Sequence, residues 1–151
     1  MKIGSTILQW IRLPKQPSIH TTINGQILNK KLFSYAPQAQ IHTADNTYHV
    51  FKTQDLMPIF KLNCFSEMSY VPELRDCDDF TWAFVGMMKK LLPGCTVGLV
   101  WADFLKSDGS RDYRHSFCFF IDENLKLVYV EPQSNACFSP TKRIKPYLFI
   151  T

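Results

Sequence analysis

Residues 76–92 read DCDDFTWAFVGMMKKLL and predict the helix around which the fold is built. Apolar residues recur at i, i+4, i+7 and i+11 from Phe80, which is the spacing of one helical face. Asp76 can cap the N-terminus of this helix, and the Pro-Gly pair that follows ends it. Cys77 is therefore expected in the first turn of a buried helix, where the helix dipole favours a thiolate.

The composition indicates a single folded domain spanning residues 1–151. A hydrophobic content of 46% supports one core, and the length is too short for two comfortable domains. The net charge of +4 is spread along the chain, so nucleic-acid binding is not indicated. No apolar run is long enough for a membrane span, and the N-terminal stretch lacks the features of a signal peptide. Five cysteines without a C-x-x-C pair favour a reduced, cytoplasmic location.

The chain before the central helix predicts short strands and turns, so residues 1–52 are expected to form a β-rich part. Within it, residues 7–13 predict a strand. Asn24 and Gly25 form the strongest short signal for a hairpin turn between the apolar stretches on either side. A helix is then predicted from residue 54 to about residue 62.

Short strands are predicted after the central helix, at residues 97–101, 115–121, 126–130 and 147–150. A three-residue hairpin loop, with Asn124 in a left-handed conformation, would pair Ile121 with Leu125. In that register His115 lies directly opposite Glu131 on one face of the sheet. A slip of one residue would place the two on opposite faces.

Cys77, His115 and Glu131 follow one another in the chain order of papain-like nucleophilic sites. In such sites a thiolate attacks, a histidine takes and returns a proton, and a carboxylate orients the imidazole. The competing interpretation treats Cys77 as a small core residue and the neighbouring aspartates as a charged first helical turn. Residues 111–114 are predicted to form a solvated turn or to border a substrate cleft.

Three motifs resemble the papain-like cysteine peptidase domain of the Marasmius oreades agglutinin and related bacterial and phage proteins. They are YVPELRDCDDF at residues 70–80, His115 at the start of a strand, and VEPQ at residues 130–133. The resemblance covers residues 70–133. It implies that Cys77 is the nucleophile, His115 the base and Glu131 the orienting acid.

The agglutinin domain depends on calcium, so the resemblance also implies a Ca²⁺ site that involves Asp78, Asp79 and Gln133. Oxygen ligands of this kind suit a hard cation. There are two departures from the family. Val71 occupies the place of the usual oxyanion glutamine, and the first 50 or so residues match no part of the family.

The predicted fold is therefore α+β and papain-like, with a central cysteine-bearing helix packed on an antiparallel β-sheet. The predicted function is a cysteine peptidase or related thiol acyl-transfer hydrolase that acts on a polypeptide, with the calcium dependence that the resemblance implies. One alternative is a catalytically silent binding module, such as a phage or bacterial inhibitor of a host protein. Another is an enzyme that cuts cell-wall peptides.

Overall fold

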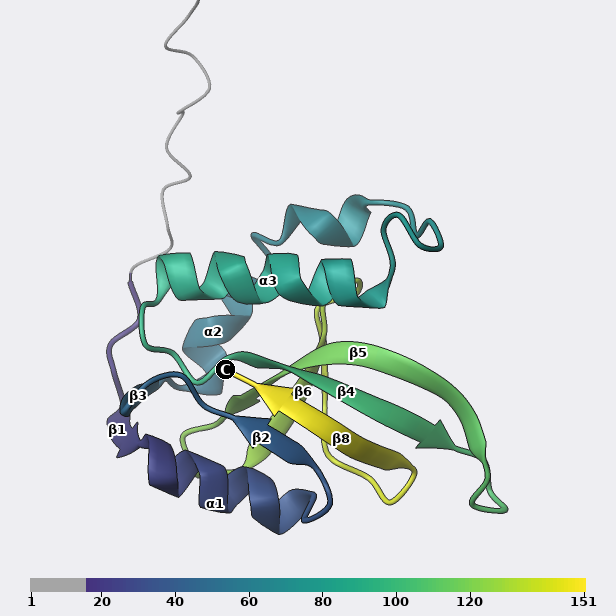
Figure 1. Cartoon of the computed structure of the whole chain (residues 1–151). Coiled ribbons are helices and arrows are strands. Elements are labelled where there is room, and N and C mark those ends of the chain that lie inside the picture. The colour runs from purple at the N-terminus through teal and green to yellow at the C-terminus, as the bar shows by residue number, and fades with distance from the viewer. Residues whose placement is uncertain (1–15) are drawn as a thin grey trace, which may run out of the picture.

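A six-stranded sheet lies between two layers of helices (Figure 1). The computed structural model describes residues 16–151, so the strand predicted at residues 7–13 lies outside the described residues. The strand order is β2-β8-β4-β5-β6-β7, and every neighbouring pair is antiparallel except β2 with β8. The strands are β2 (Gln40–His42), β4 (Gly98–Leu105), β5 (Arg111–Ile121), β6 (Leu127–Glu131), β7 (Ala136–Phe138) and β8 (Ile144–Ile150).

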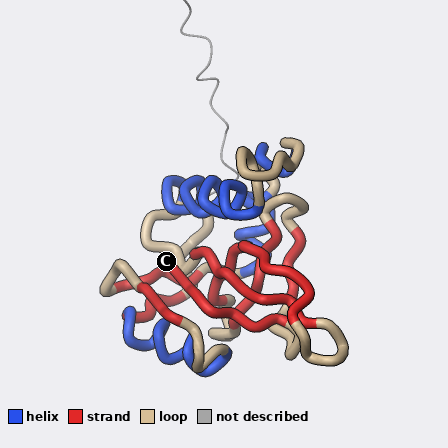
Figure 2. The backbone as a smooth tube through the Cα atoms, turned by 45° about the vertical axis from the view of Figure 1, so that its right-hand side comes forward, coloured by secondary structure: helices blue, strands red, loops and turns tan. Residues whose placement is uncertain are grey.

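Helices cover both faces of this sheet, as Figures 1 and 2 show. α1 (Gly25–Tyr35) packs on one face, while α2 (Thr53–Phe60) and α3 (Cys77–Leu91) pack on the other. A short 3-10 helix, η1 (Cys64–Glu67), joins α2 to the loop before α3. The remaining strands, β1 (Thr21–Asn24) and β3 (Thr47–Val50), form a separate two-stranded sheet.

Alternate side chains of β5 supply the two halves of the hydrophobic core, because successive residues of a strand face opposite sides. Phe117 and Phe119 pack in the cluster under α1, whereas Cys118 and Phe120 pack in the cluster under α3. All four are fully buried. Fully burying one Phe side chain contributes about 1.5–3 kcal/mol, so β5 anchors both helical layers.

The central helix is confirmed as α3, and the α+β class is confirmed with it. Phe84 and Met88 are fully buried on its inner face, whereas Trp82 is about half exposed on its outer face. The Asp79 carboxylate accepts a hydrogen bond from the Asp76 N–H at 3.1 Å, which satisfies a backbone group at the start of the helix. Among the described residues, no helix combines the length and apolarity needed to cross a membrane.

The predicted hairpin at Asn24 is wrong, because Gly25 begins α1 instead. The Asn24 side chain accepts a hydrogen bond from the Ile27 N–H at 2.8 Å, so Asn24 is a helix cap. Leu28 and Leu32 lie four residues apart on this helix, and both are fully buried. The described part of residues 1–52 is therefore mixed, because α1 lies among the three short strands β1, β2 and β3.

The predicted register of the β5–β6 hairpin is also wrong, by two residues. Ile121 pairs with Leu127 and not with Leu125. Leu125 adopts the left-handed conformation predicted for Asn124, with φ of 56°. The Asp122 side chain accepts hydrogen bonds from backbone N–H groups in the loop, which supports a longer turn than the one predicted.

Candidate functional site

Cys77 is the first residue of α3 and is partly buried. Its carbonyl oxygen accepts a hydrogen bond from the Thr81 hydroxyl at 2.7 Å, within the first turn. Thr81 is itself fully buried, so the first turn is held against the sheet. The thiol is thus carried by a rigid element at the helix end where the dipole favours negative charge.

His115 and Glu131 form a close pair on neighbouring strands of the sheet. The Nε2 atom of His115 lies 2.6 Å from Oε2 of Glu131. The other carboxylate oxygen, Oε1, accepts a hydrogen bond from the Gln133 N–H at 3.2 Å. Both oxygens of Glu131 are therefore engaged, and the carboxylate has a fixed orientation.

His115 and Glu131 meet even though the strands pair two residues away from the predicted register. Side chains alternate between the faces of a sheet with a period of two. A shift of two residues therefore keeps His115 and Glu131 on the same face, as diagonal rather than direct neighbours.

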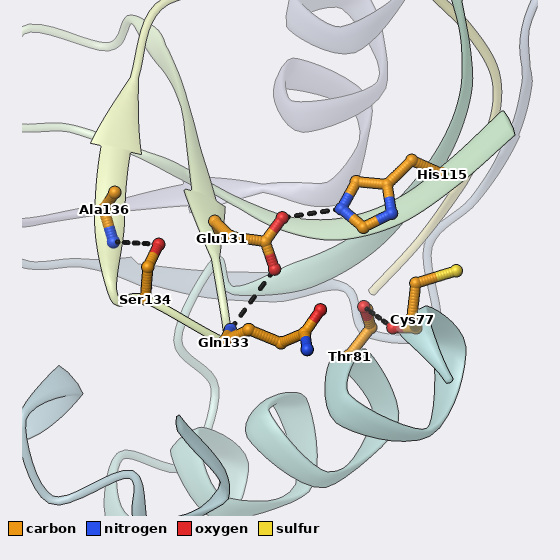
Figure 3. A network of polar contacts seen from close by, with 7 residues as sticks. All are labelled: Cys77, Thr81, His115, Glu131, Gln133, Ser134 and Ala136. Atoms are coloured by element: carbon orange, nitrogen blue, oxygen red, sulfur yellow. Dashed lines mark hydrogen bonds and ion pairs between the residues drawn. The ribbon is translucent and has the colours of Figure 1, made fainter. Parts of the chain in front are cut away.

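The imidazole of His115 lies between Glu131 and the start of α3, where Cys77 is found (Figure 3). Burial by itself lowers the pKa of His115, but hydrogen bonds to Cys77 and Glu131 outweigh burial and raise the pKa to about 9. Phe117 stacks on the ring at a centroid distance of 5.9 Å. At neutral pH this arrangement favours an imidazolium ion held between Cys77 and the Glu131 carboxylate.

A cleft of about 180 Å³ opens beside Cys77 and His115. Two polar atoms among its lining residues are buried without a hydrogen-bond partner, namely Oγ of Ser116 and Nε1 of Trp101. Such atoms cost free energy in an apolar setting unless a ligand or solvent meets them. The lining residues are Cys77, Asp78, Trp101, Arg114, His115, Ser116 and Tyr147.

Acidic side chains gather next to Cys77 at the start of α3. One ligand atom from each of Asp76, Cys77 and Asp78 lies within 4.8 Å of the others. The pKa of Asp78 is raised, first by a hydrogen bond to Asp76 and then by burial. Oδ1 of Asp76 is buried without a hydrogen-bond partner. These carboxylates have the chemistry that a hard cation such as Ca²⁺ prefers.

The structure places Cys77 and His115 at one cleft and pairs His115 with Glu131. The three predicted calcium ligands lie in three different local environments. Asp78 lies in the acidic group, Asp79 is bonded to the Asp76 backbone, and Gln133 donates its N–H to Glu131.

Sequence reasoning missed three residues of the cleft, namely Trp101, Tyr147 and the buried Ser116. It left open whether residues 111–114 border a cleft. β5 in fact begins at Arg111, and Arg114 lines the cleft. Because successive residues of a strand face opposite sides, the position of Arg114 next to His115 gave no signal for this placement.

Comparisons with known proteins found similar solved structures. No protein-family model and no curated protein match the chain. One similar structure is the PSL1a-E64 complex, with a TM-score of 0.71 and 20% identity over 86% of this chain. Another is Polyporus squamosus lectin bound to the human-type influenza-binding epitope Neu5Aca2-6Galb1-4GlcNAc, with a TM-score of 0.69 and 20% identity over 86% of this chain. The chain spans 51% and 49% of the length of these structures, and the likeness shows the fold alone.

These neighbours correct the function that was inferred from the resemblance. The second is named as a lectin with a carbohydrate ligand, and neither is named as a peptidase. The assignment to a papain-like cysteine peptidase family is therefore contradicted, as are the hydrolase and protease activities. The expectation of a polypeptide substrate or protein partner, including the silent inhibitor module, is contradicted by the same finding.

Proposed function

We propose that Cys77, His115 and Glu131 form a nucleophilic thiol site that bonds to an electrophilic carbon of a ligand in the adjacent cleft. The observation that carries this proposal is the 2.6 Å contact between His115 and Glu131, with the imidazole directed to Cys77. The proposal assigns roles to these side chains and leaves the identity of the ligand to experiment.

Each of the three side chains has its own role in the proposed reaction. In the proposed site His115 is an imidazolium and stabilises the Cys77 thiolate, whose sulfur forms a carbon–sulfur bond with the ligand while the imidazolium can give its proton to the departing leaving group. Glu131 accepts the Nε2–H hydrogen bond and stabilises the imidazolium. The packing of α3 on the sheet holds the thiol and the imidazole together before a ligand arrives.

We also propose that a hard cation such as Ca²⁺ is held at the start of α3. Asp78 stays the central ligand of this proposal, and the unpartnered Oδ1 of Asp76 suits the same role. Asp79 and Gln133 remain predicted ligands. A bound cation would offset the negative charge of these carboxylates beside the Cys77 thiolate.

The finer class of the fold, a papain-like arrangement, is likewise our proposal. It is supported by a cysteine at the N-terminus of α3, packed on an antiparallel sheet that carries His115 and Glu131.

The proposal is tested by the rate of iodoacetamide labelling at each cysteine, measured by mass spectrometry between pH 5 and pH 9. We expect Cys77 to label faster than the exposed Cys64 at pH 6–7, because a neighbouring imidazolium stabilises the thiolate. The variant His115→Ala should slow labelling of Cys77 by about tenfold. Prior incubation with E64, the compound in one of the similar structures, should also slow the labelling of Cys77.

Two controls make this experiment decisive. His20→Ala removes an exposed histidine elsewhere and should leave the labelling of Cys77 unchanged. Labelling in calcium and in a chelator tests the cation, which should speed the reaction by favouring the thiolate. A rate at Cys77 below that at Cys64, unaffected by His115→Ala, would rule out the nucleophilic site.

A second candidate function is carbohydrate binding in the same cleft. Trp101 and Tyr147 offer aromatic rings, with centroids 6.4 Å apart, beside the charged side chain of Arg114. Aromatic surface with a few convergent polar groups is typical of small-molecule sites. The carbohydrate epitope of the similar lectin supplies a specific ligand with which to test this function.

Calorimetric titration with Neu5Aca2-6Galb1-4GlcNAc tests carbohydrate binding directly. We expect heat of binding from the native chain and a loss of affinity of about tenfold or more in Trp101→Ala, because a ring contact is removed. Trp82→Ala removes an exposed tryptophan outside the cleft and is the matched control. An absence of binding at millimolar ligand would contradict this candidate.

A further inference from the structure

Arg114 brings a positive charge to the cleft beside Cys77. Its Nε atom lies 3.1 Å from Oδ1 of Asp103 on β4. Arg111 approaches the same oxygen through Nη1, at 3.9 Å. Two guanidinium groups thus share one carboxylate oxygen, so Asp103 by itself does not neutralise both.

The terminal nitrogens of Arg114 are free to bind a further group. Only its Nε makes an ion pair or side-chain hydrogen bond among residues 16–151. The guanidinium lies over the ring of Tyr147, with its central carbon 5.6 Å from the ring centroid. This cation–π contact orients the guanidinium while leaving its Nη donors unused.

Tyr147 connects Arg114 to the thiol. Tyr147, Arg114 and Cys77 all line the same small cleft. The contact of the Arg114 guanidinium with the Tyr147 ring keeps the positive charge at the wall of that cleft.

We propose that Arg114 binds a carboxylate of the ligand whose electrophilic carbon meets Cys77. This inference rests on the proposed nucleophilic site and names the chemical class of its ligand. The fork of N–H donors in a guanidinium matches the two oxygens of a carboxylate. Asp78 lines the same cleft and repels anions, so the rest of the ligand beside α3 is neutral or cationic.

A pair of matched alkylating reagents isolates this interaction. Iodoacetate and iodoacetamide both lose iodide and form the same carbon–sulfur bond, but only iodoacetate carries a carboxylate. The measured quantity is the ratio of their rate constants at Cys77, divided by the same ratio at Cys64. Cys64 is exposed and lies outside this cleft, so it supplies the ratio of an ordinary thiol.

We expect this normalised ratio to exceed one in the native chain and to fall about fivefold in Arg114→Gln, the scale of an exposed ion pair. Arg114→Lys keeps the charge but loses the fork, and should recover part of the preference. Arg143→Gln is the matched control, because Arg143 is an exposed arginine that does not line the cleft. It should leave the ratio near the native value.

A measurement on the native chain tests the same inference without relying on the folding of any variant. Acetate should slow the labelling of Cys77 by iodoacetamide more than acetamide does at equal concentration. If Cys77 reacts rapidly with iodoacetamide but shows neither this inhibition nor a response specific to Arg114, the carboxylate inference is overturned and the nucleophilic site stands. If Cys77 reacts slowly with both reagents, the nucleophilic site itself fails.

Discussion

His115 is the side chain whose charge couples the site to the stability of the fold. Its hydrogen bonds to Cys77 and Glu131 raise its pKa to about 9, above the value of about 6.5 expected in an unfolded chain. The folded state therefore binds the proton more tightly than the unfolded state does. The stabilisation that results is complete below about pH 6.5 and is lost as the pH rises through about 9.

Glu131→Gln should weaken this dependence on pH, because the neutral amide no longer stabilises the imidazolium. We expect the free energy of unfolding of the native chain to fall by about 1–2 kcal/mol between pH 6.5 and pH 9, since the pair is partly exposed to solvent. Urea denaturation at several pH values measures the change. An equal fall in Glu131→Gln would contradict the assigned role of the carboxylate.

Residue types and chain order were sufficient to nominate the three side chains of the site, but not the distances between them. Cys77, His115 and Glu131 were identified because a cysteine in a first helical turn, a histidine and a carboxylate on later strands suit one kind of chemistry. The pair His115–Glu131 survives an error in the predicted register only because that error is an even number of residues. Trp101 and Tyr147 carry no such chemical signature, so their place in the cleft needed the tertiary structure.

At the scale of elements, the Asn24-Gly25 dipeptide at the start of α1 is compatible with two local structures, a hairpin turn and a helix N-terminus. Asn and Gly favour a tight hairpin turn, but Asn is also among the best N-cap residues. The burial of Leu28 and Leu32 one helical turn apart selects the helix. A Cβ atom at Gly25 would lie 2.8 Å from the Asp45 carbonyl oxygen, so a close approach of chains also favours glycine there.

Asn24→Ala should therefore destabilise the chain by about 1 kcal/mol, because it removes the acceptor for the Ile27 N–H. Asn24→Ser retains a side-chain oxygen that can cap α1 and should keep most of the stability. Urea denaturation of the three proteins measures the difference. Equal loss in both variants would contradict the assigned role of the Asn24 side chain as the cap.

For the whole molecule, local pattern predicted the α+β class but not the order of the strands. The segments with strong apolar content, β4, β5, β6 and β8, were all anticipated within a few residues. The edge strands β2 and β7 have three residues each, too few for a pattern to identify them. The insertion of β8 between β2 and β4 depends on contacts between distant parts of the chain, which no local signal encodes.

The parallel pairing of β2 with β8 has a consequence for the time course of folding. It joins Ile41 to Phe149, about a hundred positions apart, so a long loop must close before the pairing forms. Tyr147 belongs to the same late strand and supplies one wall of the cleft. The helix that bears Cys77 can form from local contacts alone, so we expect the thiol to be exposed early in refolding and enclosed only when β8 docks.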